Sequence, residues 1–198
     1  ISRKETATAK RQLRFFRWGF AAAAALALAL LTANFLFKEQ PVLPKEVVQT
    51  QTVTVPYGAR SSFMMPDGSQ VWLNSGSTLT YASDFNHRNR NLDLEGEAFF
   101  DVVKGDHPFI INTAMGQVEV TGTRLNVKSS IDEKRFETTV ERGSVNVHCH
   151  QIQDMCSLKP GQQIRLAHGK WELLKVETEL FTSWKEGKII FRKEYLPE

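Results

Sequence analysis

The chain has 198 residues, of which 24% are charged and 41% are hydrophobic, and its formal net charge is +3. Residues 1–17 contain six Lys or Arg and one acidic residue, so the remaining 19 basic and 21 acidic residues carry a net charge of −2. The bulk of the chain therefore lacks the clustered positive field that nucleic-acid binding requires, and we expect no direct contact with DNA or RNA.

Residues 18–37 read WGFAAAAALALALLTANFLF, a run without a charge. As a helix, such a run is about 30 Å long, which matches the hydrocarbon thickness of a bilayer. Arg11, Arg14 and Arg17 lie on its N-terminal side, so the positive-inside rule places residues 1–17 in the cytoplasm and the rest of the chain outside it. A cleaved signal peptide is the alternative, but this run is longer than a usual signal core and no small-x-small cleavage site follows it. We predict a single-pass protein of the bacterial inner membrane with its C-terminal part in the periplasm.

Residues 38–52 are polar, contain Pro41 and Pro44 and predict a stiff periplasmic linker. From residue 53 to residue 175, short β-rich runs alternate with turn signals. This spacing predicts an all-β domain of short antiparallel strands, arranged as a sandwich, a barrel or a β-solenoid-like stack. The predicted strands are residues 52–55, 61–65, 70–74, 78–82, 91–94, 98–103, 109–112, 117–121, 125–129, 136–141, 144–148, 162–166 and 170–174.

Aromatic residues in half-buried strands usually belong to the core, and we assign Trp72, Phe99 and Phe109 to it. After residue 175 the pattern changes, and residues 176–184 predict one or two helical turns followed by a strand at residues 189–191. We interpret residues 176–198 as a connector to a C-terminal domain that is missing here. Because the chain begins with Ile1 rather than Met, we expect it to be a fragment of a longer protein.

The two cysteines, Cys149 and Cys156, fall in the predicted periplasmic part, where an oxidising environment allows cysteines to pair. The six residues between them suit a disulfide across a hairpin or a short loop. Free thiols are the alternative. His148 and His150 flank Cys149, but the standard zinc spacings are absent, so we expect neither a metal nor another cofactor.

Seven short motifs, in this order and spacing, resemble the periplasmic domain of FecR-type anti-sigma factors. They are residues 55–60 (VPYGAR), 66–74 (PDGSQVWLN), 96–102 (GEAFFDV), 108–111 (PFII), 122–127 (GTRLNV), 143–145 (GSV) and 158–163 (LKPGQQ). The resemblance covers residues 50–192. Two departures exist: position 125 is Leu where the family usually has Phe, and residues 1–17 are shorter than the family's sigma-binding segment. The contact with the sigma factor therefore cannot be mapped onto this chain.

The resemblance implies an inner-membrane regulator with three protein partners. Outside the membrane it receives the signalling domain of an outer-membrane TonB-dependent transporter. Inside the cell it holds or releases an extracytoplasmic-function sigma factor, and an intramembrane protease cuts near or within the anchor. The rival interpretation is a membrane-tethered module that binds a glycan or the cell wall and has no cytoplasmic partner. A concave, exposed, aromatic-lined strand face would favour the rival, and a short exposed edge strand would favour the regulator.

The sequence contains no catalytic constellation. The five histidines lack a neighbouring nucleophile signature, and Asp67 belongs to a turn rather than acting as a general base. We therefore expect no enzyme that acts on a separate substrate. Some FecR-like proteins cut themselves between Gly and Thr, however, and Gly122-Thr123 matches that position. A hydroxyl one residue after a flexible glycine can attack the preceding carbonyl if the turn is strained. The alternative is structural: Gly122 provides a positive φ in a tight turn, and Thr123 starts the next strand.

Overall fold

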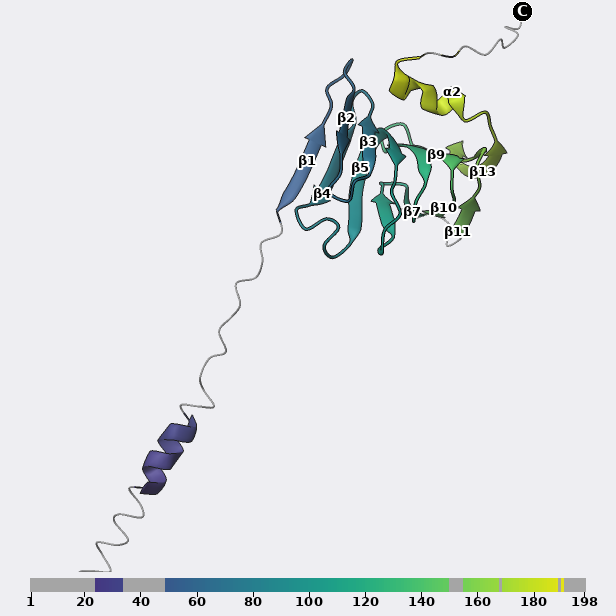
Figure 1. Ribbon diagram of the computed structural model, residues 1–198. Coiled ribbons are helices and arrows are strands. Elements are labelled where there is room, and N and C mark those ends of the chain that lie inside the picture. Colours follow the sequence, from purple (N-terminus) through teal and green to yellow (C-terminus); the bar gives the residue numbers. More distant parts are fainter. Residues whose placement is uncertain (1–23, 34–48, 150–154, 168, 189, 191–198) are drawn as a thin grey trace, which may run out of the picture. The chain divides into compact units, whose positions relative to one another are not determined.

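The computed structural model (Figure 1) consists of two compact units, Ile1–Val47 and Val48–Glu198. It describes residues 24–33, 49–149, 155–167, 169–188 and 190. In the first unit, residues 24–33 form helix α1. The rest of the predicted span 18–37 and the predicted tail 1–17 lie outside the described residues. Within the described part of the chain, no helix has the length and apolar character needed to span a membrane.

The described residues of the second unit form thirteen strands, which confirms the all-β prediction. The strands are β1 (Thr50–Thr54), β2 (Ser61–Met64), β3 (Gln70–Leu73), β4 (Thr78–Ala82), β5 (Arg90–Asp101), β6 (Phe109–Asn112), β7 (Gly116–Val120), β8 (Arg124–Ser130), β9 (Arg135–Arg142), β10 (Val145–Cys149), β11 (Met155–Leu158), β12 (Gln162–Ala167) and β13 (Lys170–Lys175). Two details differ from the prediction. Residues 91–94 and 98–103 were expected as separate strands, but residues 91–94 and 98–101 lie in the single strand β5, and β11 was not predicted.

Strand β5 joins two sheets because its two halves have different neighbours. The first half pairs with β4 and, in parallel, with β6, whereas the second half pairs with β3 and β8. Sheet A then continues through β7, β10 and β11, with β1 beyond β4, and sheet B continues through β9, β12 and β13, with β2 beyond β3. Gly96 lies where the halves meet, at φ +97°, and a Cβ there would lie 2.5 Å from Ser77 Oγ and 2.7 Å from Ser77 Cα. The close approach of the two backbones therefore requires glycine at this position.

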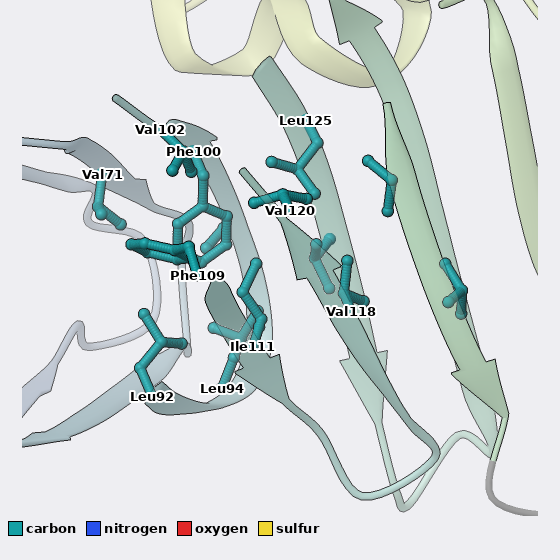
Figure 2. Packing of buried hydrophobic residues seen from close by; sticks show 14 of the residues in the cluster. Val71, Leu92, Leu94, Phe100, Val102, Phe109, Ile111, Val118, Val120 and Leu125 are labelled. Atoms are coloured by element: carbon teal, nitrogen blue, oxygen red, sulfur yellow. The ribbon is translucent and has the colours of Figure 1, made fainter. Parts of the chain in front are cut away.

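Alternate residues of both sheets form a single hydrophobic core, as expected of a sandwich-like arrangement (Figure 2). Phe109 is fully buried in it and packs edge-on against Phe100, with ring centroids 5.9 Å apart. Phe99 is also fully buried but does not belong to this cluster, because it points to the opposite face of sheet B. Trp72 shares that outer face, is only half-buried and meets Phe99 edge-on at 5.6 Å. The core assignment is thus confirmed for Phe109 and, as burial outside the main cluster, for Phe99, whereas Trp72 is only half-buried.

The segment after β13, residues 176–188, is called the strap below. It contains α2 (Glu179–Thr182) and the 3₁₀ helix η1 (Ser183–Glu186), which confirms the predicted helical turns. Gly187 ends η1 in the left-handed conformation, at φ +73°. The predicted strand at residues 189–191 lies, except for Ile190, outside the described residues.

Candidate functional site

A row of side chains crosses the outer face of sheet B, and the strap contacts two of them, Phe99 and Asn126. Trp72, Phe99, Asn126, Thr139 and Gln163 occupy matching register positions on β3, β5, β8, β9 and β12. The last four side chains are at most 4% exposed. Side chains on the outer face of a two-sheet domain normally meet water. Their burial marks this row as a docking surface within the chain.

The strap holds this surface through two neighbouring side chains. Trp184 Nε1 donates a hydrogen bond to Asn126 Oδ1 at 3.0 Å. Lys185 Nζ lies 4.2 Å from the ring centroid of Phe99 and 3.7 Å from Glu141 Oε1, and its side chain is only 7% exposed. A partly desolvated ammonium above a ring is favourable because the ring face carries negative charge. These contacts explain why Phe99 is buried on the outer face.

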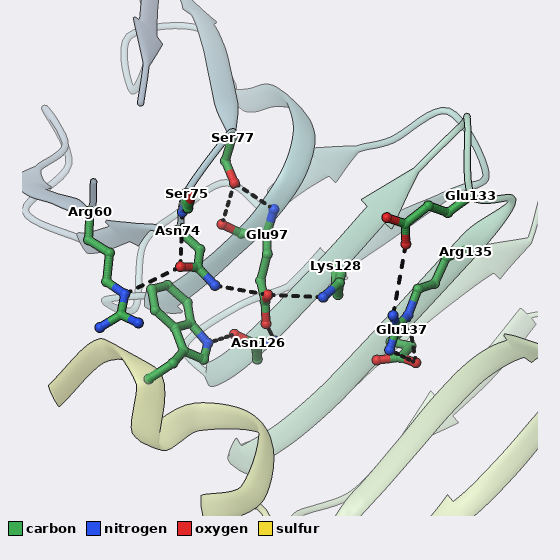
Figure 3. Close-up of polar contacts among 11 residues, drawn as sticks. Arg60, Asn74, Ser75, Ser77, Glu97, Asn126, Lys128, Glu133, Arg135 and Glu137 are labelled. Atoms are coloured by element: carbon green, nitrogen blue, oxygen red, sulfur yellow. Dashed lines mark hydrogen bonds and ion pairs between the residues drawn. The ribbon is translucent and has the colours of Figure 1, made fainter. Parts of the chain in front are cut away.

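The carboxylate of Glu97 accepts hydrogen bonds from two amide side chains and forms an ion pair with a lysine (Figure 3). Its Oε1 accepts from Asn126 Nδ2 at 3.0 Å, its Oε2 accepts from Asn74 Nδ2 at 3.0 Å, and Lys128 Nζ lies 3.3 Å from Oε2. Asn74 Oδ1 in turn accepts from Arg60 Nε at 3.4 Å. Residues from the loop before β2, from the turn after β3 and from two central strands thus share one polar network. The sequence offers one signal for it, a glutamate directly before the apolar residues 98–100.

Asp67, assigned to a turn from the sequence, is part of a buried polar cluster. Its Oδ1 accepts from the Ser69 backbone N–H at 2.9 Å, and its Oδ2 accepts from Ser69 Oγ at 2.8 Å and from Arg90 Nη1 at 3.1 Å. Arg90 also donates to the backbone carbonyls of His107 and Val103. All of these contacts are structural. The role of Arg90 was not predicted, because its partners lie in two loops that only the fold brings together.

Gly122 does not have a positive φ, so the structural alternative proposed for it from the sequence is wrong in that respect. Glycine is favoured there by crowding instead, since a Cβ would lie 2.5 Å from Lys104 Cγ. Gly143 also packs closely against the peptide group between Gly122 and Thr123. A Cβ at Gly143 would lie 2.8 Å from Thr123 Oγ1 and 2.9 Å from the carbonyl oxygen of Gly122.

Thr123 directly precedes β8 and is 1% exposed. Its hydroxyl donates to the backbone carbonyl of Ser144 at 2.8 Å, and its own carbonyl accepts from the Val102 N–H at 2.9 Å. The Ser144 carbonyl orients the hydroxyl but is too weak a base to remove its proton. The observed contacts therefore hold this residue in place.

The structure has both cysteines as free thiols, Cys149 buried and Cys156 partly buried. Cys156 pairs with Val147 across β10 and β11, so Cys149 lies diagonal to it rather than directly opposite. Diagonal neighbours are typically about 7–8 Å apart, beyond the usual Cα separation of a disulfide. Burial raises the pKa of the Cys149 thiol to about 11, with a smaller contribution from Cys156. This geometry favours the free-thiol alternative over the expected disulfide.

A cleft of about 390 Å³ is lined by residues of β4, of the first half of β5 and of the C-terminal ends of β6 and β8. Its lining includes the carboxylates of Asp93 and Glu95, which follow each other on one face of the strand, and the hydroxyl side chains of Thr78 and Thr80. None of the residues lining the cleft is aromatic. In the described part of the chain, no three His, Cys, Asp or Glu side chains gather in a way that could hold a metal ion.

Comparisons with known proteins agree with the motifs. A family model described as "FecR protein" matches residues 50–146. Two crystal structures of a proposed anti-sigma factor from Parabacteroides distasonis ATCC 8503, at 2.50 Å and 1.65 Å resolution, are 29% identical to this chain and have TM-scores of 0.66 and 0.65. The matches cover 70% and 69% of this chain but only 66% and 65% of those chains. A search of curated proteins returned no match.

Proposed function

We propose, from the premise that residues 50–146 form a FecR domain, that this protein is an anti-sigma regulator. The proposal depends on one observation: a family model and two solved structures of a proposed anti-sigma factor all match this chain. The regulatory role belongs to the whole protein, and this chain spans just under two thirds of the length of those structures. The sigma factor is therefore the first partner to be tested.

In finer detail, the proposed protein is anchored in the bacterial inner membrane by residues 18–37 and carries its FecR domain in the periplasm. The signalling domain of an outer-membrane TonB-dependent transporter docks on the periplasmic side. An extracytoplasmic-function sigma factor is held in the cytoplasm and is released after an intramembrane protease cuts near or within the anchor. Proteolysis is part of the proposal because one isolated helix transmits a change of shape poorly.

The sheet edges support docking of a protein partner. Within the described residues, β1, β2, β11 and β13 each pair with a single neighbouring strand. An unpaired strand edge offers backbone donors and acceptors to which a partner strand can add. A short edge strand of this kind was the feature expected of the regulator.

The proposed topology is tested by labelling intact cells with a small maleimide that does not cross the inner membrane. Starting from a variant with Cys149→Ala and Cys156→Ala, Tyr57→Cys provides a reporter at a position that is 92% exposed. Glu5→Cys is the matched cytoplasmic control. We expect Tyr57→Cys to be labelled in intact cells and Glu5→Cys only after lysis. The reverse pattern would exclude a periplasmic FecR domain.

The partners are tested by affinity purification of the full-length protein from its native envelope. Recovery of a sigma factor together with a transporter signalling domain is the expected result. The rival function, binding of a glycan or the cell wall, predicts recovery of wall material alone. Two observations speak for the regulator: Phe99 is fully buried and Trp72 half-buried on the outer face of sheet B, and no aromatic side chain lines the cleft. Neither function requires a cofactor.

A further inference from the structure

The surface between the strap and sheet B contains several polar groups, and water can form hydrogen bonds with the same groups when the strap is absent. Of the buried side chains in the covered row, Asn126, Thr139 and Gln163 are polar, and the strap contributes the ammonium of Lys185. Thr139 and Gln163 already satisfy each other through a 2.8 Å hydrogen bond that does not involve the strap. A permanently buried surface is usually more apolar, whereas contacts between domains that separate and rejoin have this mixed character. Detachment of the strap would therefore leave the hydrogen bond between Thr139 and Gln163 intact.

A continuous series of contacts leads from the strap to the N-terminal end of the domain. Trp184 fixes the amide of Asn126, and the other end of that amide donates to Glu97. The backbone N–H of Glu97 donates to Ser77 Oγ at 2.8 Å, and Ser77 Oγ donates back to the carbonyl of Glu97 at 3.0 Å. The carbonyl of Ser77 accepts from the Val55 N–H at 2.9 Å.

Two members of this series, Ser77 and Val55, are confined by packing. Ser77 is fully buried against Gly96, where any side chain would collide with it, and Val55 is 3% exposed. Val55 directly follows β1, which pairs on one side only, with β4. Strand β1 is the first strand after the predicted linker. The C-terminal end of β1 is therefore held by a hydrogen bond to Ser77, and the hydroxyl of Ser77 also forms hydrogen bonds with the backbone of Glu97.

We propose that docking of the strap and pairing of strand β1 are energetically coupled through Glu97. When Trp184 leaves Asn126, the amide of Asn126 is free to rotate and Glu97 loses one of its fixed donors. The turn at Ser77 is then held less firmly, and β1 opens more often at its free edge. The strap is the last described segment before the C-terminus, and β1 is the strand nearest in sequence to the predicted anchor, so the coupling connects the two ends of the domain.

Amide hydrogen exchange on the purified 198-residue chain in detergent tests this coupling directly. Trp184→Phe removes the indole N–H that holds Asn126. Loss of one such hydrogen bond should accelerate exchange of the amides of β1 about two- to tenfold. The strap should exchange faster as well, whereas strand β6, which lies outside the series, should keep its wild-type rate.

Trp171→Phe is the matched control, because the indole N–H of Trp171 is buried without a hydrogen-bond partner. It makes the same change of side chain and should leave β1 unaffected. Glu97→Gln should by itself accelerate exchange in β1, and adding Trp184→Phe to it should have no further effect on that strand. Unchanged exchange of β1 in Trp184→Phe would overturn the coupling, whether or not the strap loosens. Equal acceleration in β1 and β6 would overturn it too, since this would indicate global destabilisation.

The use of this coupling as a signal relay rests on the proposed function, but the exchange experiment includes neither a sigma factor nor a transporter. A failure of the coupling therefore leaves the regulatory role standing. Conversely, a failure to recover a sigma factor from the envelope leaves the exchange result valid.

Discussion

Arg90 Nη1 lies 3.1 Å from Asp67 Oδ2, and the two side chains are only 1% and 2% exposed. The pair ties the turn between β2 and β3 to the first residue of β5. The remaining donors of Arg90 are directed at backbone carbonyls of the loop after β5. When one member of a buried ion pair is removed, the other charge stays in a region of low dielectric without compensation.

Asp67→Asn should therefore lower the free energy of unfolding by about 3–5 kcal/mol, because it leaves the guanidinium of Arg90 buried without its counter-ion. Denaturant unfolding followed by far-UV circular dichroism measures this change. Asp84→Asn is the control, since Asp84 pairs at 3.6 Å with an Arg88 side chain that is 63% exposed. An exposed pair contributes at most about 1 kcal/mol. Equal losses in both variants would contradict the importance of burial.

Gly143→Ala should destabilise the domain more than Gly58→Ala does. Both glycines have a left-handed backbone, with φ of +92° and +84°, so each substitution carries a conformational cost of about 1–2 kcal/mol. Only at Gly143 does the new methyl group also meet fixed atoms, Thr123 Oγ1 and the Gly122 carbonyl oxygen, whereas the space around Gly58 is open. Thermal unfolding of the two variants measures the difference, and equal melting temperatures would contradict the close packing around Thr123.

Thr123→Ala should lower stability by about 1–3 kcal/mol, because the buried carbonyl of Ser144 loses its hydrogen-bond donor. Thr123→Ser keeps the donor and should retain most of the stability. We expect wild-type protein to keep its full mass during long incubation at neutral pH, as measured by mass spectrometry. A fragment that begins at Thr123, formed by wild type and Thr123→Ser but not by Thr123→Ala, would instead identify Gly122-Thr123 as a self-cleavage site.

The two thiols should react with alkylating reagents at different rates. Burial raises the pKa of Cys149 from 9.0 to about 11, so little of its reactive thiolate is present at pH 8, and the partly buried Cys156 should be modified first. Alkylation of Cys149 should accelerate with each pH unit up to about 11. The pKa of this thiol is 9.0 in the unfolded chain and about 11 in the folded chain, so the unfolded chain loses the proton first as pH rises. The contribution of the thiol to stability is therefore complete below pH 9 and is lost as pH rises through about 11. Peptide mapping measures both rates, and an intact disulfide in the native protein would contradict the free-thiol geometry.

Much of the secondary structure follows from the sequence, because strand formation depends on local patterns. Alternating apolar residues and closely spaced turn residues predict nearly every strand, and the motif order predicts the FecR domain. Strand β11 was missed because residues 155–158 (MCSL) contain no β-branched or aromatic residue. The residues at Gly96 predict a break between two strands, although the structure makes a continuous strand there that passes from one sheet to the other.

The side-chain roles depend on residues that are distant in the sequence, and these only the tertiary structure decides. An alternating strand pattern assigns Phe99 to a face but cannot reveal that Lys185, from the C-terminal strap, covers that face. The ion-pair partner of Arg90 and the diagonal placement of Cys149 and Cys156 follow from loop positions and strand register, which no local pattern encodes. The physical reason is that backbone preferences act over a few residues, whereas burial and electrostatic pairing depend on which surfaces the completed sheets bring into contact.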